Sequence, residues 1–140
     1  PGGGAACPRG GRGTSAGALA WGSRGGERGD APEAVRANRA VVCAARGVDA
    51  AGVDMLHQVH GAAVRRAPDA EGRGRFLGEL RGWPEGDALV SETPGATLAV
   101  LGADCLPVLL WRRDRPAVGA AHAGWRGLVA GVLEEAVAAL

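Results

Sequence analysis

Apolar and polar positions divide the first half of the chain into two different parts. Residues 1–30 are rich in glycine and show almost no periodic apolar pattern, which indicates loop or poorly ordered chain. Apolar residues then recur at helical spacing, which predicts a helix near residues 32–46. We expect Asp30 to be its N-cap, Pro32 to occupy its first turn and Gly47 to end it.

The pattern after this helix changes to short apolar runs separated by turn residues. Two short strands are expected around Gly61, followed by a long excursion over residues 67–86 that is rich in glycine, proline and charge. Four further runs predict a sheet with at least one buried face: 87–91, 97–102, 107–111 and 117–122. Residues 128–140 return to helical spacing, and the pattern reaches the last residue without a stop signal. We therefore expect a fragment truncated at its C-terminus.

Composition excludes several classes of protein. A chain of 140 residues with 46% hydrophobic and 22% charged residues suits one globular domain. The net charge of +1 gives no overall field for nucleic acid, and no apolar run approaches the roughly 18 residues of a membrane span. The three cysteines imply no disulfide framework. We expect a cytoplasmic protein with neither nucleic-acid nor membrane partners, and no oligomeric state is predicted.

Three residues of types that commonly bind transition metals lie at or just beyond the predicted strand ends. His60, Cys105 and His122 each have Gly or Ala neighbours, which let a ligand and the backbone approach closely. Two imidazoles and a thiolate suit Zn²⁺ and leave one coordination position open, as in catalytic zinc sites. His57 precedes His60 by three positions, so on a strand the two would face opposite sides and only His60 would reach the site. Spacing alone favours a buried structural cysteine and ordinary surface or hydrogen-bonded histidines over a metal site.

The same residues and their neighbours allow other chemistry. Cys105 and His122 could form a thiolate–imidazole pair in a metal-free hydrolase or deamidase. Asp87 and Asp104 could each orient a histidine or accept a ribose hydroxyl, although a solvated or capping carboxylate is the favoured interpretation of either. Arg126 precedes the last predicted helix, where a guanidinium could bind phosphate or simply lie on the surface.

Several motifs together resemble the laccase-domain family, which is labelled multicopper polyphenol oxidase and also purine nucleoside phosphorylase. The resemblance spans residues 13–140, and its ADC and AHAGWRG elements are highly specific. The matching segments are GDAPEAV at 29–35, HQVHG at 57–61, GDALVS at 86–91, LGADCLPVLL at 101–110 and AHAGWRG at 121–127. Two further family elements near the start are matched only loosely, at 9–15 and 21–25.

The resemblance implies an α/β (α+β) fold, with a mixed β-sheet core flanked by helices as in the laccase-domain/cytotoxic-factor-like fold. Residues 31–140 would be the N-terminal part of a single catalytic domain. His60, Cys105 and His122 would be both the catalytic residues and the ligands of Zn²⁺, with copper as the alternative ion. For such a reaction, the residues that we expect to contact the purine nucleoside and phosphate, from their own chemistry, are Arg126, Asp104 and Asp87.

The implied reaction is phosphorolysis of adenosine and inosine to the free base and ribose 1-phosphate. Phosphorolysis of methylthioadenosine and deamination of adenosine are implied as well, the latter because zinc can activate water for attack on the purine. Three alternatives remain. They are the metal-free Cys/His enzyme, an inactive fragment whose cut sheet leaves open edges, and a copper-dependent phenol oxidase. The copper enzyme is disfavoured because multicopper centres need many more histidines than the three in this chain.

Overall fold

The computed structural model describes residues 31–68, 76–77 and 83–140, so the expected Gly-rich leader lies outside the described residues. The described chain is a mixed α+β structure with mixed sheets and helices, which confirms the predicted fold class. A 3-10 turn, Ala50–Gly52, follows the first helix. In chain order the helices and strands are α1 (Pro32–Arg46), β1 (Val53–Asp54), β2 (Val64–Arg66), β3 (Ala88–Ser91), β4 (Thr97–Leu98), β5 (Leu106–Trp111), β6 (Val118–Ala123), α2 (Trp125–Val129) and α3 (Val132–Ala139).

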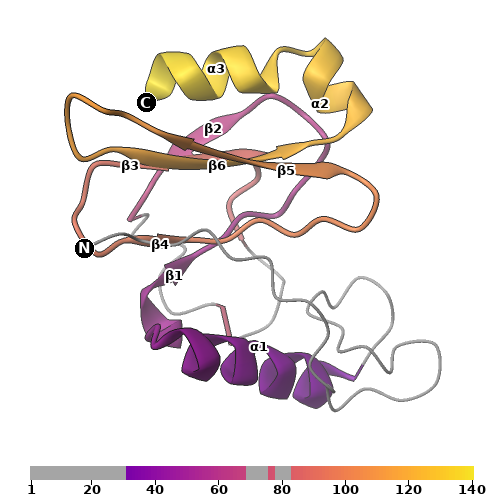
Figure 1. Ribbon diagram of the computed structural model, residues 1–140. Coiled ribbons are helices and arrows are strands. Elements are labelled where there is room, and N and C mark those ends of the chain that lie inside the picture. Colours follow the sequence, from indigo (N-terminus) through magenta and orange to yellow (C-terminus); the bar gives the residue numbers. More distant parts are fainter. Residues whose placement is uncertain (1–30, 69–75, 78–82) are drawn as a thin grey trace.

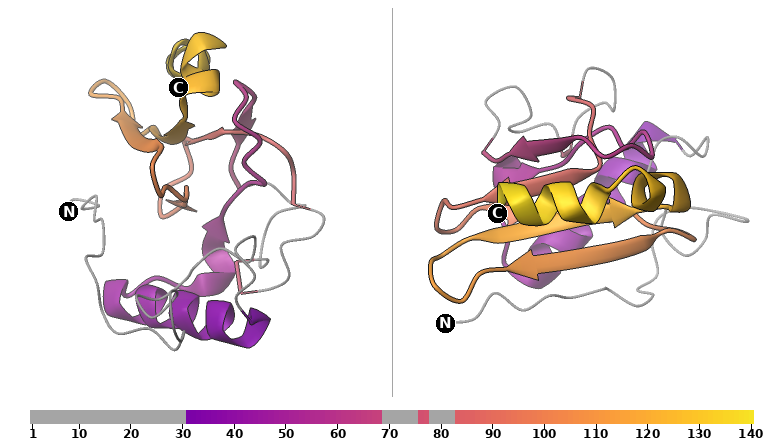
Figure 2. Two further views of the ribbon diagram at one scale, coloured as in Figure 1. Left: turned by 90° about the vertical axis from the view of Figure 1, so that its right-hand side faces the viewer. Right: turned by 90° about the horizontal axis from the view of Figure 1, so that it is seen from above.

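The elements form layers (Figure 1). The main sheet has the strand order β2-β3-β6-β5, in which β2 and β3 run parallel and the other two pairs run antiparallel. Helices α2 and α3 cover one face of this sheet, and the view from above shows α3 lying across it (Figure 2). The small parallel pair β1–β4 lies on the other side of the main sheet, and α1 lies beyond that pair.

Helix α1 has the predicted bounds but a different N-cap. It runs over Pro32–Arg46, with Pro at its start, and Gly47 ends it in the left-handed conformation at φ 62°. Ala31 is the N-cap and makes no side-chain capping bond, so the expectation that Asp30 caps the helix is wrong. Proline is pre-organised for the first helical turn and glycine tolerates positive φ, so both boundaries are set locally. The inner side of α1 contributes to a core cluster of Cys43, Val53, Met55, Phe76 and Trp83.

The strands expected around Gly61 are much shorter in the structure. Residues 55–60 form no strand and contribute only an isolated bridge between His57 and Glu85, while the second expected strand is reduced to β2. The His57 amide donates to Pro84 O and its carbonyl accepts from the Gly86 amide. The backbone hydrogen-bonding groups of this segment are thus partly paired with the residues that precede β3. The predicted strand at 97–102 is likewise reduced to β4.

The single helix predicted over 128–140 is two helices. Gly131 adopts φ 86° between α2 and α3, and this left-handed residue changes the chain direction. Helix α3 packs on the sheet through Val132 and Ala136, and the buried strand residues of this cluster are all alanine: Ala88, Ala121 and Ala123. These small side chains let the helix lie close to the strands.

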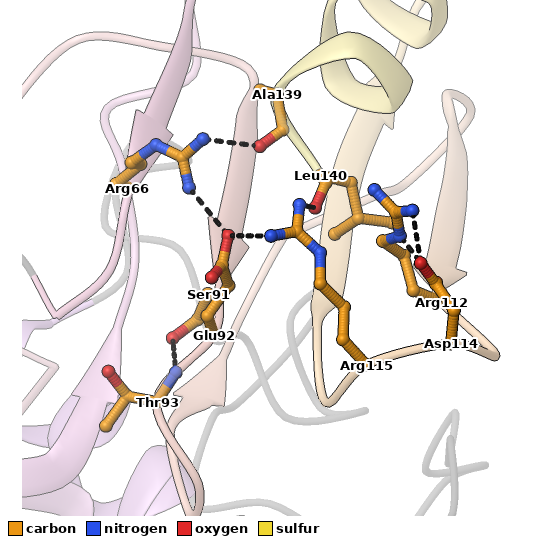
Figure 3. A network of polar contacts seen from close by, with 9 residues as sticks. All are labelled: Arg66, Ser91, Glu92, Thr93, Arg112, Asp114, Arg115, Ala139 and Leu140. Carbon is orange, nitrogen blue, oxygen red and sulfur yellow. Dashed lines mark hydrogen bonds and ion pairs between the residues drawn. The ribbon is translucent and has the colours of Figure 1, made fainter.

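Two arginines hold the C-terminal end of α3 against the sheet (Figure 3). Arg66 donates to Ala139 O at 2.8 Å, and Arg115 donates to Leu140 O at 2.7 Å. Both guanidinium groups also pair with the Glu92 carboxylate, at 3.4 and 3.2 Å. Cations near the last carbonyls complement the negative end of the helix dipole.

Candidate metal centre

Strands β5 and β6 bring Cys105 and His122 to the same end of the main sheet. In their antiparallel register Leu106 lies opposite Ala123 and Pro107 lies opposite His122. Cys105 directly precedes β5, so it lies beside Gly124, which directly follows β6. A pair of residues separated by 17 positions in the chain is therefore brought together by one hairpin.

His60 reaches the same place from an irregular loop between β1 and β2. Its backbone is in the left-handed region, at φ 61°, which is uncommon for a residue with a side chain. This conformation costs about 1–2 kcal/mol. Three consecutive amides, those of residues 59–61, donate to the carboxylate of Asp87 at 3.2, 2.9 and 2.7 Å. These bonds offset the cost and fix the loop.

The three predicted ligands converge in the structure. One donor atom each from His60, Cys105 and His122 can be chosen so that all three lie within 4.8 Å of one another. The two imidazole rings meet edge to face, with centroids 4.8 Å apart and planes at 82°. His122 is 3% exposed, Cys105 is half-buried and His60 is exposed, so one side of the group is open to solvent. Nitrogen and thiolate donors in this number suit Zn²⁺ with an open coordination position.

Two glycines keep the space around the group free. A Cβ on Gly124 would lie 3.0 Å from Cys105 Sγ and 3.0 Å from His60 Cδ2. A Cβ on Gly127 would lie 2.8 Å from Gly61 O, so helix α2 could not approach the His60 loop with a side chain there. The absence of side chains at these positions allows the ligand-bearing segments to come close together, which fits a group that holds a metal ion.

Asp87 lies behind the two histidines. Its side chain is fully buried, and its Oδ1 lies 2.9 Å from His122 Nδ1, within hydrogen-bonding distance. The same carboxylate binds the amides of the His60 loop, and the Asp87 carbonyl accepts from the His122 amide at 2.7 Å. Two roles were expected for Asp87, and this geometry favours orientation of a histidine over contact with a ribose hydroxyl.

Gln58 is a residue of this site that the sequence pattern did not single out. Its Nε2 donates to Leu101 O at 2.8 Å and its Oε1 accepts from the Leu101 amide at 2.7 Å. This two-way bond joins the His60 segment to the loop that leads to Cys105. Its signals in the sequence were its position between two histidines and its place within the HQVHG segment at 57–61.

Two other predicted site residues lie at the surface. Asp104 is exposed and does not belong to the three-residue group. Arg126 is exposed, with its guanidinium 5.4 Å from the ring centroid of Trp125, which is itself 71% exposed. His57 is also outside the group, as expected. The expectation that a strand turns His57 and His60 to opposite sides is wrong, however, because residues 57–60 are an irregular loop.

The two described cysteines occupy different environments. Both are free thiols. Cys43 lies in the core cluster below β1, where burial raises the pKa of its thiol and the nearby charge of Asp49 raises it further. Cys105 is half-buried beside the two histidines. Cys43 is therefore a packing residue, and Cys105 is the cysteine placed for chemistry.

Two curated proteins with similar sequences are named purine nucleoside phosphorylases. The chain is 45% identical over 113 residues to the purine nucleoside phosphorylase YfiH of Escherichia coli, covering 81% of this chain and 42% of that protein. It is 47% identical over 118 residues to the purine nucleoside phosphorylase SCO2081 of Streptomyces coelicolor, covering 83% of this chain and 45% of the relative. The chain thus spans about half the length of these relatives.

A solved structure and a family model extend the comparison. The Neisseria meningitidis protein NMB0706 superposes with a TM-score of 0.75 at 45% identity, over 91% of this chain and 48% of that one. A family model described as multi-copper polyphenol oxidoreductase laccase matches residues 6–140, nearly the whole chain. The chain belongs to this laccase-domain family.

Proposed function

We propose that His60, Cys105 and His122 bind Zn²⁺ and that residues 31–140 are the N-terminal part of the catalytic domain of a purine nucleoside phosphorylase. The observation that carries the proposal is the convergence of the three donor atoms within 4.8 Å. The names of the similar proteins supply the reaction. Zinc is chosen over copper because the two-imidazole, one-thiolate set with an open position is typical of catalytic zinc.

The reaction joins inorganic phosphate to the ribose of adenosine, inosine or methylthioadenosine. A phosphate oxygen bonds to the anomeric carbon as the bond from that carbon to the purine nitrogen breaks. The base leaves with the bonding electron pair and takes up a proton. His60, Cys105 and His122 would hold Zn²⁺, which would supply Lewis-acid chemistry, including the activation of water that deamination of adenosine needs. Arg126 would bind phosphate and Asp104 would contact the nucleoside, since both side chains face solvent near the group.

The decisive experiment measures metal and product on the same samples. We expect about one zinc per chain, lost in Cys105→Ala and retained in Cys43→Ala, because only the first thiol lies at the centre. Chromatography of reactions with adenosine, with and without phosphate, would show adenine only when phosphate is present and inosine when deamination occurs. This assay is run on this chain and on the full-length gene product, because the chain spans about half of its relatives.

Arg126 can be tested separately. We expect Arg126→Ala to raise the KM for phosphate more than the KM for nucleoside, because a guanidinium binds phosphate by paired, charge-assisted bonds. Arg113→Ala, which removes another exposed arginine, provides the matched control. An unchanged dependence on phosphate would eliminate Arg126 from this role.

One alternative has a structural observation in its favour. A ring nitrogen of His122 lies within 4.8 Å of Cys105 Sγ, so a small side-chain movement would form the thiolate–imidazole pair of a metal-free hydrolase. Zinc content separates the two proposals, since the metal-free enzyme would be active with none. The proposed compartment is the reducing cytoplasm, which the two free thiols support. In the described part of the chain, none of the helices has the length and apolar character to cross a membrane.

A further inference from the structure

We propose that Asp87 is the positioning residue of the metal centre, setting the tautomer of His122 and the backbone conformation of His60 at the same time. This role rests on the proposed metal site and concerns a residue that would touch neither metal nor substrate. The carboxylate has two oxygens, and each accepts two bonds from the chain itself.

The first half of the role concerns His122. The Asp87 side chain already accepts hydrogen bonds from three backbone amides, so the ring nitrogen facing it takes the donor role and carries a proton. That nitrogen is Nδ1, 2.9 Å from Asp87 Oδ1. The neutral ring then has its lone pair on Nε2, the nitrogen left to bind a metal. The side chain of His122 is 4% exposed, so water does not compete for Nδ1.

The second half of the role concerns His60. Asp87 Oδ1 accepts the His60 amide, and Oδ2 accepts the amides on either side of it, from Val59 and Gly61. Three consecutive amides directed at one carboxylate form an anion-binding nest, which holds His60 at φ 61°. One side chain thus anchors two ligands that are 62 positions apart in the sequence.

The register of the sheet explains why Asp87 can do this. Ala88 pairs with Ala121 on the neighbouring strand, so Asp87 lies directly next to His122 at the end of that pair. The backbones of the two residues are also bonded, because the His122 amide donates to Asp87 O at 2.7 Å. Neither partner can shift along the strand without breaking this pairing. Asp87 is therefore placed by the sheet, and the two histidines are placed by Asp87.

The substitution Asp87→Asn tests the tautomer directly, because it keeps the shape of the side chain. The new amide has one accepting oxygen and one donating NH₂ group. If the oxygen keeps the amides of Val59 and Gly61, the NH₂ replaces Oδ1, so the bond from the His60 amide is lost and His122 Nδ1 must accept. The proton moves to Nε2 and blocks the metal-binding nitrogen. We expect zinc affinity to fall about 10- to 100-fold in competition with a chelator.

The tautomer of His122 distinguishes this role from a merely structural one, because a loss of structural support alone would not change which ring nitrogen carries the proton. Long-range ¹H–¹⁵N spectra of the metal-free protein, recorded at about pH 8.5, well above the ordinary histidine pKa, distinguish the two neutral forms. The chain has three histidines, so single substitutions of the other two assign the His122 signal. We expect the Nδ1–H form in the unsubstituted protein and the Nε2–H form in Asp87→Asn.

The matched control is Asp49→Asn, which alters another carboxylate that binds a backbone amide, far from the centre in the fold. It should leave both the His122 tautomer and zinc affinity unchanged. An Nε2–H tautomer in the unsubstituted protein would overturn the proposal even if Asp87→Asn failed to fold. So would unchanged zinc affinity in a folded Asp87→Asn. The spectra need neither zinc nor substrate. They therefore test the role of Asp87 independently of whether the proposed reaction takes place.

Discussion

Gly124→Ala should disrupt the metal centre by adding a single methyl group between two of its ligands. The new Cβ would lie 3.0 Å from both Cys105 Sγ and His60 Cδ2. Unstrained contacts between such atoms are about 3.5–4.0 Å, so each neighbour must move by about 0.5 Å. Gly124 itself has φ −72° and ψ 160°, which alanine adopts freely, so the effect is steric and owes nothing to backbone strain.

The size of the effect follows from how small a displacement of its ligands a metal site tolerates. Distances from ligands to zinc are defined to about 0.2 Å, less than half of the required movement. We expect zinc affinity to fall at least about 10-fold, which corresponds to about 1.4 kcal/mol. Crowding should also lower the free energy of unfolding of the metal-free protein by about 1–3 kcal/mol.

Chelator competition would give the zinc affinity, and urea denaturation with and without chelator would give the stability. Gly52→Ala is the matched control, because a Cβ at that glycine meets nothing within 4 Å. If Gly124→Ala bound zinc as tightly as Gly52→Ala, the three side chains would not share one ion in this arrangement. The reasoning from the 3.0 Å contacts would then be refuted.

Three further predictions concern other parts of the chain. Gln58→Ala should reduce zinc affinity severalfold and speed alkylation of Cys105, because the two-way bond to Leu101 steadies the loop leading to that thiol; unchanged alkylation would contradict this. Val132→Ala should lower the free energy of unfolding by about 1–2 kcal/mol, measured with urea, because the side chain is fully buried between α3 and the sheet. A change near zero would mean that α3 does not pack as described. Because the pKa of Cys43 is raised in the folded protein, the free energy of unfolding should fall as pH rises above about 8.5, where the unfolded thiol begins to ionise. Cys43→Ala should lessen this fall. An equal dependence of the free energy of unfolding on pH in both proteins would disprove the prediction.

Much of the secondary structure could be predicted from the sequence because its signals are local. Pro32 is the first residue of α1 and Gly47 directly follows its last residue, so both ends are marked locally and the structure has the predicted bounds. The hairpin of β5 and β6 follows from two apolar runs joined by turn residues, and the two strands pair in the structure as that pattern suggests. The break between α2 and α3 was missed, because a glycine within a helical pattern does not by itself reveal that it adopts positive φ.

The candidate ligands were identified partly from the residues and mainly from a resemblance. His60, Cys105 and His122 are metal-binding residue types beside small neighbours, but their spacing matches no compact metal motif. The ADC and AHAGWRG elements made the set specific, and the structure brings the three side chains together. The loop conformation of His60 was not foreseen, since the apolar pattern around it suggested strands.

The sequence by itself determined where helices and turns begin and end, because proline, glycine and periodic apolar side chains act within a few residues of their own positions. Only the tertiary structure decided what holds the centre in place. Asp87 binds amides 26–28 residues before it, and Gln58 binds Leu101 at a separation of 43 residues. No periodic pattern marks such partners, because each is a single polar side chain placed by the register of strands elsewhere in the chain. Their roles appear only once the sheet has brought distant backbone groups within hydrogen-bonding distance.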